Sequence, residues 1–521
     1  MKQYIIFTLF LSLLFSSCYE DLGNYEYHDI NELVVTGVSS SYSVSMDVGS
    51  LIINPVIQMT QQDPDDPRFE YSWVVKRGSV VVDTIGHTRN INWRASLPVA
   101  TYSLFFKVMD RITGITDVVS STLNIVTYHN RGIMLIGENA QGNAQAQMIV
   151  MVEGQEEVFY DDILQYSGLP TLQGPINFFH SGNYGTLSNA VKKLWIATES
   201  GSYFLNNLTL QAESNYCTFD AFFPFAPSEP LNLVEMAPKI SANNGNTGGN
   251  GYRYFLCSNG NLYGTYYLLT GDEFDSPLNK LPGPPELIPA SGPLLYALIT
   301  TQTNVLWYDK SNQRFLKLGN PLTMTTSELL VDNVGEIFPW NQNGRTYVYG
   351  ENTRSTDQGA TGGNSFAIMR ETTINPDREY DYCIYKLYCG ATALKQGFYT
   401  INKSEAPLFG TGTQYAFSST RAVLFYIANG KLYAYDYNPV TNRNYEIALA
   451  DNNEVTMVMY DHQREPGSEY LYVATYSAST GGTLYKYSLD NDLNTVRLES
   501  TPRETWTGTV KLRNMSWRGG E

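Results

Sequence analysis

The sequence predicts an all-β protein with an N-terminal β-sandwich followed by a seven- or eight-bladed β-propeller. Short segments of alternating apolar and polar residues recur throughout the chain, for example KLWIATES, KLYAYDYN and EYLYVATYS. Such alternation is typical of half-buried strands. Beyond residue 30, almost no stretch has the i, i+3, i+4, i+7 apolar spacing of an amphipathic helix. The chain has 521 residues, more than one core accommodates, so two or more domains are expected.

Residues 1–17 have the three parts of a secretory signal peptide. Lys2 supplies a positive charge, residues 4–15 form an apolar run, and two serines precede Cys18. The apolar run is too short to span a hydrocarbon core of about 30 Å as a helix. The pattern resembles a bacterial lipoprotein signal, which implies that Cys18 is the lipidated N-terminus of the mature chain. The alternative is a buried N-terminal strand with an incidental cysteine.

Residues 18–30 are predicted to form an acidic tether between the lipid and the first domain. Glu20 and Asp21 resemble the export signal that sends Bacteroidota lipoproteins to the outer face of the outer membrane, although an ordinary solvated linker has the same composition. Two or more acyl chains give stable attachment, whereas one gives only marginal binding. The expected location is therefore the outer membrane, with the protein lipid-anchored and facing the extracellular side.

Composition excludes one class of partner and restricts another. The chain has 34 Lys and Arg residues against 51 Asp and Glu residues, for a formal net charge of −17. Nucleic-acid binding needs basic patches, so no nucleic-acid partner is expected. Contact with a membrane is expected only through the lipid anchor, because anionic lipid surfaces attract basic segments.

The remaining cysteines, Cys217, Cys257, Cys383 and Cys389, form no CxxC motif and no Cys/His cluster. No metal site and no cofactor are therefore predicted. Cys383 and Cys389 would lie on one face of a strand about 20 Å apart, too far for a disulfide unless the chain turns back. Small core residues are the preferred interpretation.

Residues 31–127 are predicted to form the sandwich, because about seven short strands in roughly 100 residues are typical of that architecture. Trp73 alternates with Tyr71 and Val75, so its side chain is expected in the core. The predicted strands are Glu32–Val38, Tyr42–Val48, Leu51–Gln58, Phe69–Lys76, Val80–Ile85, Tyr102–Met109 and Ile115–Val126.

Two segments of this domain, FEYSWVV and ATYSLFFKVMD, resemble PKD-type immunoglobulin-like domains. In those domains a Tyr-x-Trp strand packs against a strand that here would end near Asp110. Asp63, Asp65 and Asp66 could form a calcium loop, but no glutamate or glycine completes a known ligand spacing, so a solvated turn is preferred.

Residues 128–521 are predicted to form the propeller. A strand, a polar turn and a second strand with an aromatic residue recur at intervals typical of four-stranded blades, about 40–50 residues. The final segment, Thr509–Trp517, is expected to complete the first blade. A large sandwich or a solenoid is the alternative. The markers of the repeat are Phe204, Tyr263, Leu306, Tyr347, Tyr399, Tyr433 and Tyr485.

The sequence carries no recognised catalytic motif. None of the five histidines belongs to HExxH, and no Gly-x-Ser-x-Gly turn or phosphate-binding loop is present. The glycine-rich segments 245–253 and 351–366 are interpreted as a flexible loop and a mobile insertion. Asp490 and Asp492 are interpreted as a turn, with calcium binding as the minor alternative. No catalytic residue and no ligand-binding residue is therefore assigned. Paired carboxylates stay possible, because their pairing is spatial rather than sequential.

The start of the mature chain, C-Y-x-D-x-G-N-Y-x-Y at Cys18–Tyr27, together with the Tyr-x-Trp domain resembles the PKD-like family of Bacteroidota lipoproteins. This resemblance implies a non-enzymatic accessory or substrate-binding component of a SusC/SusD-type TonB-dependent importer. The implied partners are the barrel, the lid lipoprotein and an oligopeptide or oligosaccharide, with the peptide preferred. A glycan-binding surface protein, a propeller hydrolase or lyase, and an adhesion or inhibitor module are the alternatives.

Overall fold

The protein consists of two compact units, Met1–Val126 and Thr127–Glu521, so the division lies one residue from the boundary expected from the sequence. Each unit is described by itself. The computed structural model describes residues 31–46, 50–98, 100–126, 129, 131–151, 156–165, 167–180, 193–207, 210–212, 217–225, 227–238, 252–266, 274, 276–283, 285–299, 304–321, 323–490 and 496–519.

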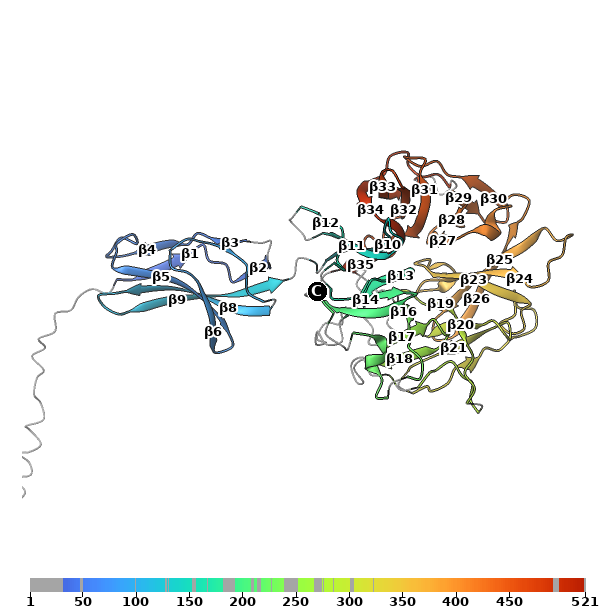
Figure 1. The fold of residues 1–521 in the computed structure, drawn as a ribbon, viewed down its shortest axis with the longest axis horizontal. Helices are drawn as coiled ribbons and strands as arrows, with labels where there is room; N and C mark the ends of the chain where they lie inside the picture. Colours follow the sequence, from blue (N-terminus) through green and yellow to red (C-terminus); the bar gives the residue numbers. More distant parts are fainter. Residues whose placement is uncertain are drawn as a thin grey trace, which may run out of the picture. The chain divides into compact units, whose positions relative to one another are not determined.

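The first unit is a β-sandwich (Figure 1). One layer is a five-stranded sheet in the order β2-β9-β8-β5-β6, in which β2 runs parallel to β9 and the other pairs are antiparallel. The other layer contains the pairs β1-β4 and β3-β7. The strands are β1 (Leu33–Thr36), β2 (Ser41–Ser45), β3 (Ser50–Ile53), β4 (Val56–Met59), β5 (Phe69–Arg77), β6 (Val80–Gly86), β7 (Ile91–Arg94), β8 (Ala100–Asp110) and β9 (Thr116–Val126).

Trp73 is fully buried in this core, as predicted. Its ring centroid lies 4.4 Å from that of Phe106, and its indole N–H donates to the carbonyl of Thr88 at 3.0 Å. The indole therefore satisfies its own polar group while filling the space between the layers.

The prediction of one strand over Leu51–Gln58 is wrong. The segment forms two strands, β3 and β4, which pair with different partners. Pro55 lies between them and has no N–H to donate to a continuous ladder. The partner of β3 is β7, a strand that was not predicted at all.

The described residues of the second unit form seven antiparallel sheets that follow one another around a common centre in chain order (Figure 1). The arrangement is β-propeller-like. The first four sheets contain β10 (Arg131–Glu138), β11 (Ala144–Val150), β12 (Val158–Tyr160) and β35 (Lys511–Gly519); β13 (Pro175–His180), β14 (Lys193–Thr198) and β15 (Gly201–Asn206); β16 (Leu233–Ala237), β17 (Tyr252–Cys257) and β18 (Leu262–Tyr266); β19 (Ala290–Tyr296), β20 (Val305–Asp309), β21 (Arg314–Leu318) and β22 (Glu328–Leu329).

The last three sheets have four strands each. They contain β23 (Arg345–Asn352), β24 (Ser365–Glu371), β25 (Tyr380–Cys389) and β26 (Ala393–Asn402); β27 (Gln414–Phe417), β28 (Val423–Ala428), β29 (Lys431–Asp436) and β30 (Arg443–Glu446); β31 (Glu454–Tyr460), β32 (Tyr470–Ser477), β33 (Gly481–Ser488) and β34 (Glu504–Thr509). The described helices are short 3-10 turns, η2 (Phe219–Phe222), η3 (Asp357–Gly359) and η4 (Phe409–Thr411). In the part of the chain that the structure describes, no helix is long and apolar enough to cross a membrane.

Each pair of neighbouring sheets buries its own apolar cluster, so the strands are covered on both faces. In β20, Trp307 belongs to the cluster shared with the third sheet, whereas Leu306 and Tyr308 belong to the cluster shared with the fifth sheet. Because successive side chains of a strand point to opposite faces, both faces must be apolar. This explains continuous apolar runs such as VLWY at residues 305–308.

The C-terminal strand completes the first sheet, as predicted. β35 pairs with β10 in antiparallel register and also contacts β13 and β31. The alignment of repeat markers, by contrast, is wrong in part. Tyr347 and Tyr399 lie on the first and last strands of the same sheet, and the first sheet contains no marker. The aromatic residues do not occupy one repeated position, so their spacing did not follow the sheets.

Candidate functional site

A cavity of about 300 Å³ lies at the centre of the second unit. All seven innermost strands, β13, β16, β19, β23, β27, β31 and β35, contribute to its wall. Aromatic rings and side-chain amides dominate the lining, together with a few charged groups. The lining includes Glu235, Tyr349, Glu351, Asn352, Gln414, Tyr415, Asp461, His462, Gln463, Arg464, Arg513, Asn514, Ser516 and Trp517.

The innermost strands have one edge without a strand partner, and lining side chains bind the backbone groups along that edge. Asn352 of β23 accepts from the N–H of Tyr296 at 2.7 Å and donates to the carbonyl of Leu294 at 2.9 Å. Glu235 of β16 accepts from the N–H of Leu294 at 2.9 Å. Buried backbone groups need such partners, so these side chains hold neighbouring sheets together.

The same kind of contact continues around the cavity to the closing strand. Gln414 accepts from the N–H of Val458 at 3.0 Å and donates to the carbonyl of Arg513 in β35 at 2.8 Å. Asn514 and Ser516 of β35 donate to backbone carbonyls of β13. The lining amides thus have a structural role, because their hydrogen bonds link innermost strands of different sheets around the cavity.

Glu351 and His462 form a mostly buried acid–base pair in the cavity wall. The Nε2 atom of His462 lies 3.2 Å from Oε1 of Glu351, and each side chain is 11% exposed. Oε2 of Glu351 accepts from the N–H of Phe417 at 2.7 Å, which fixes the carboxylate on the next sheet. The Tyr349 hydroxyl also approaches Oε2, at 3.4 Å.

The loop after β31 places His462 at the cavity. Asp461 caps this turn by accepting from the backbone amides of Gln463 and Arg464, at 3.1 and 2.7 Å. Gln463 in turn accepts from the N–H of Trp517 at 2.8 Å, which attaches the loop to β35. Hydrogen bonds therefore fix the loop at its start, through Asp461, and at its centre, through Gln463.

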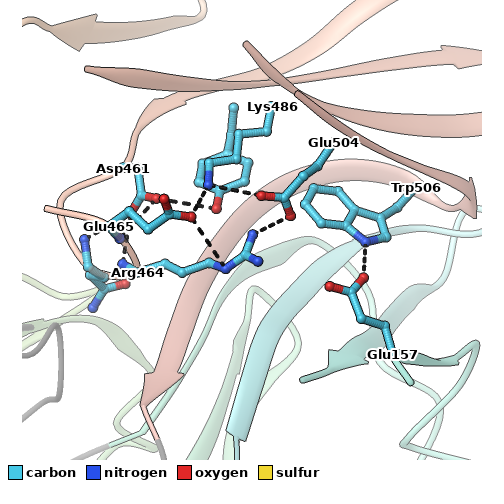
Figure 2. A network of polar contacts seen from close by, with 9 residues as sticks. Glu157, Asp461, Arg464, Glu465, Lys486, Glu504 and Trp506 are labelled. Atoms are coloured by element: carbon cyan, nitrogen blue, oxygen red, sulfur yellow. Dashed lines mark hydrogen bonds and ion pairs between the residues drawn. The ribbon is translucent and has the colours of Figure 1, made fainter. Parts of the chain in front are cut away.

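A charge network lies behind this loop (Figure 2). Lys486, whose side chain is 1% exposed, pairs with Glu465 and with Glu504, the latter at 3.1 Å. Arg464 pairs with Glu504 at 2.5 Å. The indole N–H of Trp506 donates to Glu157 at 2.9 Å, and this bond joins the seventh sheet to the segment before β12. Both cations of this network, Lys486 and Arg464, thus have a carboxylate partner.

Burial keeps the tyrosine hydroxyls at the cavity and the thiols of Cys383 and Cys389 protonated. Burial and then the Glu351 charge raise the pKa of Tyr349 well above its ordinary value. Burial likewise raises the pKa of Tyr472, with Asp461 adding to the effect. Burial raises the pKa of Cys383 and of Cys389 to about 12. The tyrosines therefore act as neutral hydrogen-bonding groups, and these two thiols are not activated nucleophiles at neutral pH.

The aspartates and cysteines that the sequence suggested as metal ligands or disulfide partners have other contacts in the structure. Asp63 and Asp66 accept from backbone amides two residues ahead, both at 2.9 Å, and Asp65 pairs with Arg89 at 3.0 Å, which are the contacts of a turn. No group of three or more His, Cys, Asp or Glu that could hold a metal ion occurs among the described residues. Cys217, Cys257, Cys383 and Cys389 are buried and unpaired with one another. Cys18, residues 245–251 and Asp492 lie outside the described residues.

The interpretation of residues 351–366 as a mobile insertion is wrong. The segment contains the end of β23, η3 and the start of β24, and Asn364 and Ser365 are fully buried. Asn364 donates to Asp357 at 2.6 Å, and Lys386 pairs with Asp357. Side-chain hydrogen bonds replace apolar packing here, so the polar composition concealed an ordered segment that carries Glu351 and Asn352.

Together, the fold and the cavity define an all-β protein with a sandwich and a propeller-like unit. Residues 18–174 match the model of the PKD-like family, a range that runs from within the first unit into the beginning of the second. No curated protein matches the chain.

Solved structures with low similarity include two from Bacteroides thetaiotaomicron. One is a quinoprotein alcohol dehydrogenase-like protein, with 11% identity, a TM-score of 0.39, and coverage of 92% of this chain and 97% of that chain. The other is the extracellular domain of a one-component system, with 12% identity, a TM-score of 0.30, and coverage of 87% and 56%. A surface component of the type-IX secretion system of Porphyromonas gingivalis has 8% identity, a TM-score of 0.21, and coverage of 78% and 62%.

Proposed function

We propose that this protein is a lipid-anchored, non-enzymatic component of a SusC/SusD-type TonB-dependent importer, facing outward from the outer membrane. In this proposal the second unit is a seven-bladed propeller that binds an oligopeptide and passes it to the importer. The observation that carries the proposal is the family match, which begins at Cys18, the residue that directly follows the predicted lipoprotein signal of residues 1–17. The signal and the family match are thus adjacent in the sequence.

The central cavity supports the binding part of the proposal. Its volume of about 300 Å³ is at the lower end of the range for small-ligand sites, roughly 300–1,000 Å³. Tyrosine and tryptophan side chains offer apolar faces with polar tips. The carboxylates of Glu235 and Glu351 each bind a backbone amide of the next sheet, which favours a structural and binding role over proton transfer.

Co-purification tests the proposal. The protein, with its lipid intact, is tagged in its native host and purified from detergent-solubilised outer membranes, and associated proteins are identified by mass spectrometry. A SusC/SusD-type pair is expected in stoichiometric amount, and it should be absent when Cys18→Ala prevents anchoring. A membrane-inserted protein that brings down neither member of such a pair would contradict the proposal.

A hydrolase or lyase is the second candidate, and the Glu351–His462 pair is the observation that favours it, because such a pair could transfer a proton. Repurified protein should be incubated with peptides and with polysaccharides. No turnover is expected. Turnover that Glu351→Gln abolishes would establish the enzyme instead, and binding of oligosaccharides alone would favour the glycan-binding alternative.

A further inference from the structure

We infer that the central cavity recognises a cationic group, the guanidinium or ammonium of a basic peptide, and that Glu351 is its counter-ion. The inference rests on the proposed function and specifies the ligand class of the same site. It is carried by the charge balance of the cavity wall and by the fixed position of one carboxylate.

The described wall contains three carboxylates, from Glu235, Glu351 and Asp461, and no lysine. Two arginines also line it, but each pairs with a carboxylate that is not part of the wall. Arg464 pairs with Glu504 at 2.5 Å and Arg513 with Glu138 at 3.0 Å. These outside carboxylates compensate both arginines, and the two wall carboxylates that could meet a ligand near the loop after β31 are Glu351 and Asp461.

Asp461 is less suited to bind a ligand than Glu351. It accepts hydrogen bonds from the amides of Gln463, Arg464 and Glu465, so the turn uses both of its oxygens. Arg354, which donates to the carbonyl of His462 at 3.1 Å, adds a favourable charge near Asp461. A second cation gains little at this carboxylate.

Glu351, by contrast, has one oxygen held and one facing an exchangeable partner. The bond from the N–H of Phe417 fixes Oε2, while Oε1 faces His462, which carries a charge only when protonated. The Tyr349 and Tyr415 rings, with centroids 5.4 Å apart, also line the cavity. A carboxylate beside aromatic faces is an environment in which a guanidinium or ammonium is bound by charge and by cation–π attraction.

An anionic ligand would meet Glu351 and Asp461 at the same wall, and like charges at close range oppose binding. A neutral sugar could donate hydroxyl hydrogen bonds to these carboxylates, but it would gain no charge–charge attraction from them. The net charge of −17 adds a long-range attraction for cations.

The test uses the purified mature chain and two peptides that differ only in charge. The first is N-acetyl-Gly-Arg-Gly-amide, and the second has citrulline, a neutral isostere of arginine, in place of the arginine. Unblocked Gly-Gly-Gly tests a terminal ammonium. Calorimetry should give a dissociation constant about tenfold or more lower for the arginine peptide than for the citrulline peptide.

Glu351→Gln should raise the dissociation constant of the arginine peptide to that of the citrulline peptide and leave the latter unchanged. Glutamine retains an oxygen for the Phe417 amide, so the variant is expected to melt at the wild-type temperature. The matched control is Glu454→Gln, which removes an exposed carboxylate paired with Lys511 outside the wall, and it should bind like wild type.

Equal binding of the two peptides, or unchanged selectivity in Glu351→Gln, would overturn the inference. So would failure of all three peptides to bind. Neither result touches the proposed importer role, because co-purification with the importer is measured without these peptides. Loss of the importer partner together with intact arginine selectivity would instead remove the proposed function and leave the cation site.

Discussion

Ile133 of β10 and Trp517 of β35 lie opposite each other in one antiparallel ladder, so a strand from the C-terminal end completes the sheet that begins the second unit. Both residues are buried in the apolar cluster that the first sheet shares with the seventh. The C-terminal strand thus closes the ring through its backbone and through its side chains.

Deletion of residues 511–521 should therefore open the second unit. The change removes the partner of β10 and the Asn514 and Ser516 bonds to β13. Scanning calorimetry of the full chain should show the transition of the second unit lowered by about 10 °C or more, or lost. The transition of the first unit serves as the internal control. An unchanged second transition would mean that β35 contributes little to closure.

Trp73→Ala should destabilise the first unit by about 3–5 kcal/mol, the usual cost of truncating a large buried aromatic. The variant also leaves the carbonyl of Thr88 without its indole donor. Urea unfolding of the full chain gives a transition for the first unit, and the change in its free energy of unfolding measures the loss of stability. Val81→Ala on β6, where the side chain is 54% exposed, is the control and should change little. Wild-type stability in the tryptophan variant would contradict the role of Trp73 as the centre of this core.

The all-β class, the strand containing Trp73 and the closing strand were readable from sequence because each depends on local alternation. β7 was missed because INWR has only four residues, too few to show a clear alternation of apolar and polar residues. The split at Pro55 was readable in principle, since proline interrupts a ladder. The local pattern of apolar and polar residues thus suffices to predict a strand where the alternation runs through the strand without interruption.

The cavity was not readable from sequence. Glu351 and His462 come from different sheets, and their meeting depends on the number and lengths of all intervening strands and loops. The polar lining residues also look like loop residues in the sequence, because their role is to bind backbone edges rather than to pack. Asn352 and Gln414 find these partners on the neighbouring sheet, so their role depends on how consecutive sheets pack.

Lys486→Met should cost the second unit about 1–3 kcal/mol, the cost of leaving charged hydrogen-bonding groups without a partner. Glu465 and Glu504 are 41% and 29% exposed, so water partly replaces the lysine. Chemical denaturation measures the change. Lys431→Met removes a lysine whose pair with Glu446 is exposed on both sides, and this control should remain at wild-type stability. Equal effects of the two variants would show that burial of Lys486 does not matter.

Protonation of Asp332 should lower the free energy of unfolding of the second unit at acid pH. Partial burial alone would raise its pKa, but the Lys395 ammonium and the amides of Trp340 and Asn341 outweigh burial and hold the pKa at about 2. Because the folded-state pKa is depressed below the ordinary value of 3.8, the contribution is complete above about pH 4 and is lost as the pH falls toward 2.

Denaturation of wild type and Asp332→Asn from pH 6 to pH 2 tests this dependence. The variant should be the less stable protein at pH 6, and the difference should shrink as the unfolded-state carboxylate takes up its proton first. A difference that stays constant over this range would show that the Lys395 contact does not depend on the charge of Asp332.

Cys18→Ala should abolish lipid attachment. The prediction follows from the short apolar run that ends at Ser17-Cys18 and from the family match that begins at the cysteine. Cells grown with radiolabelled palmitate should incorporate label into the wild-type protein only, and the variant should be recovered in soluble form or retained at the inner membrane. Ser17→Ala keeps a small residue before the cysteine and is the matched control, expected to be labelled like wild type. Label in the Cys18 variant would show that the anchor is attached elsewhere, and the proposed place of the protein at the importer would then need another basis.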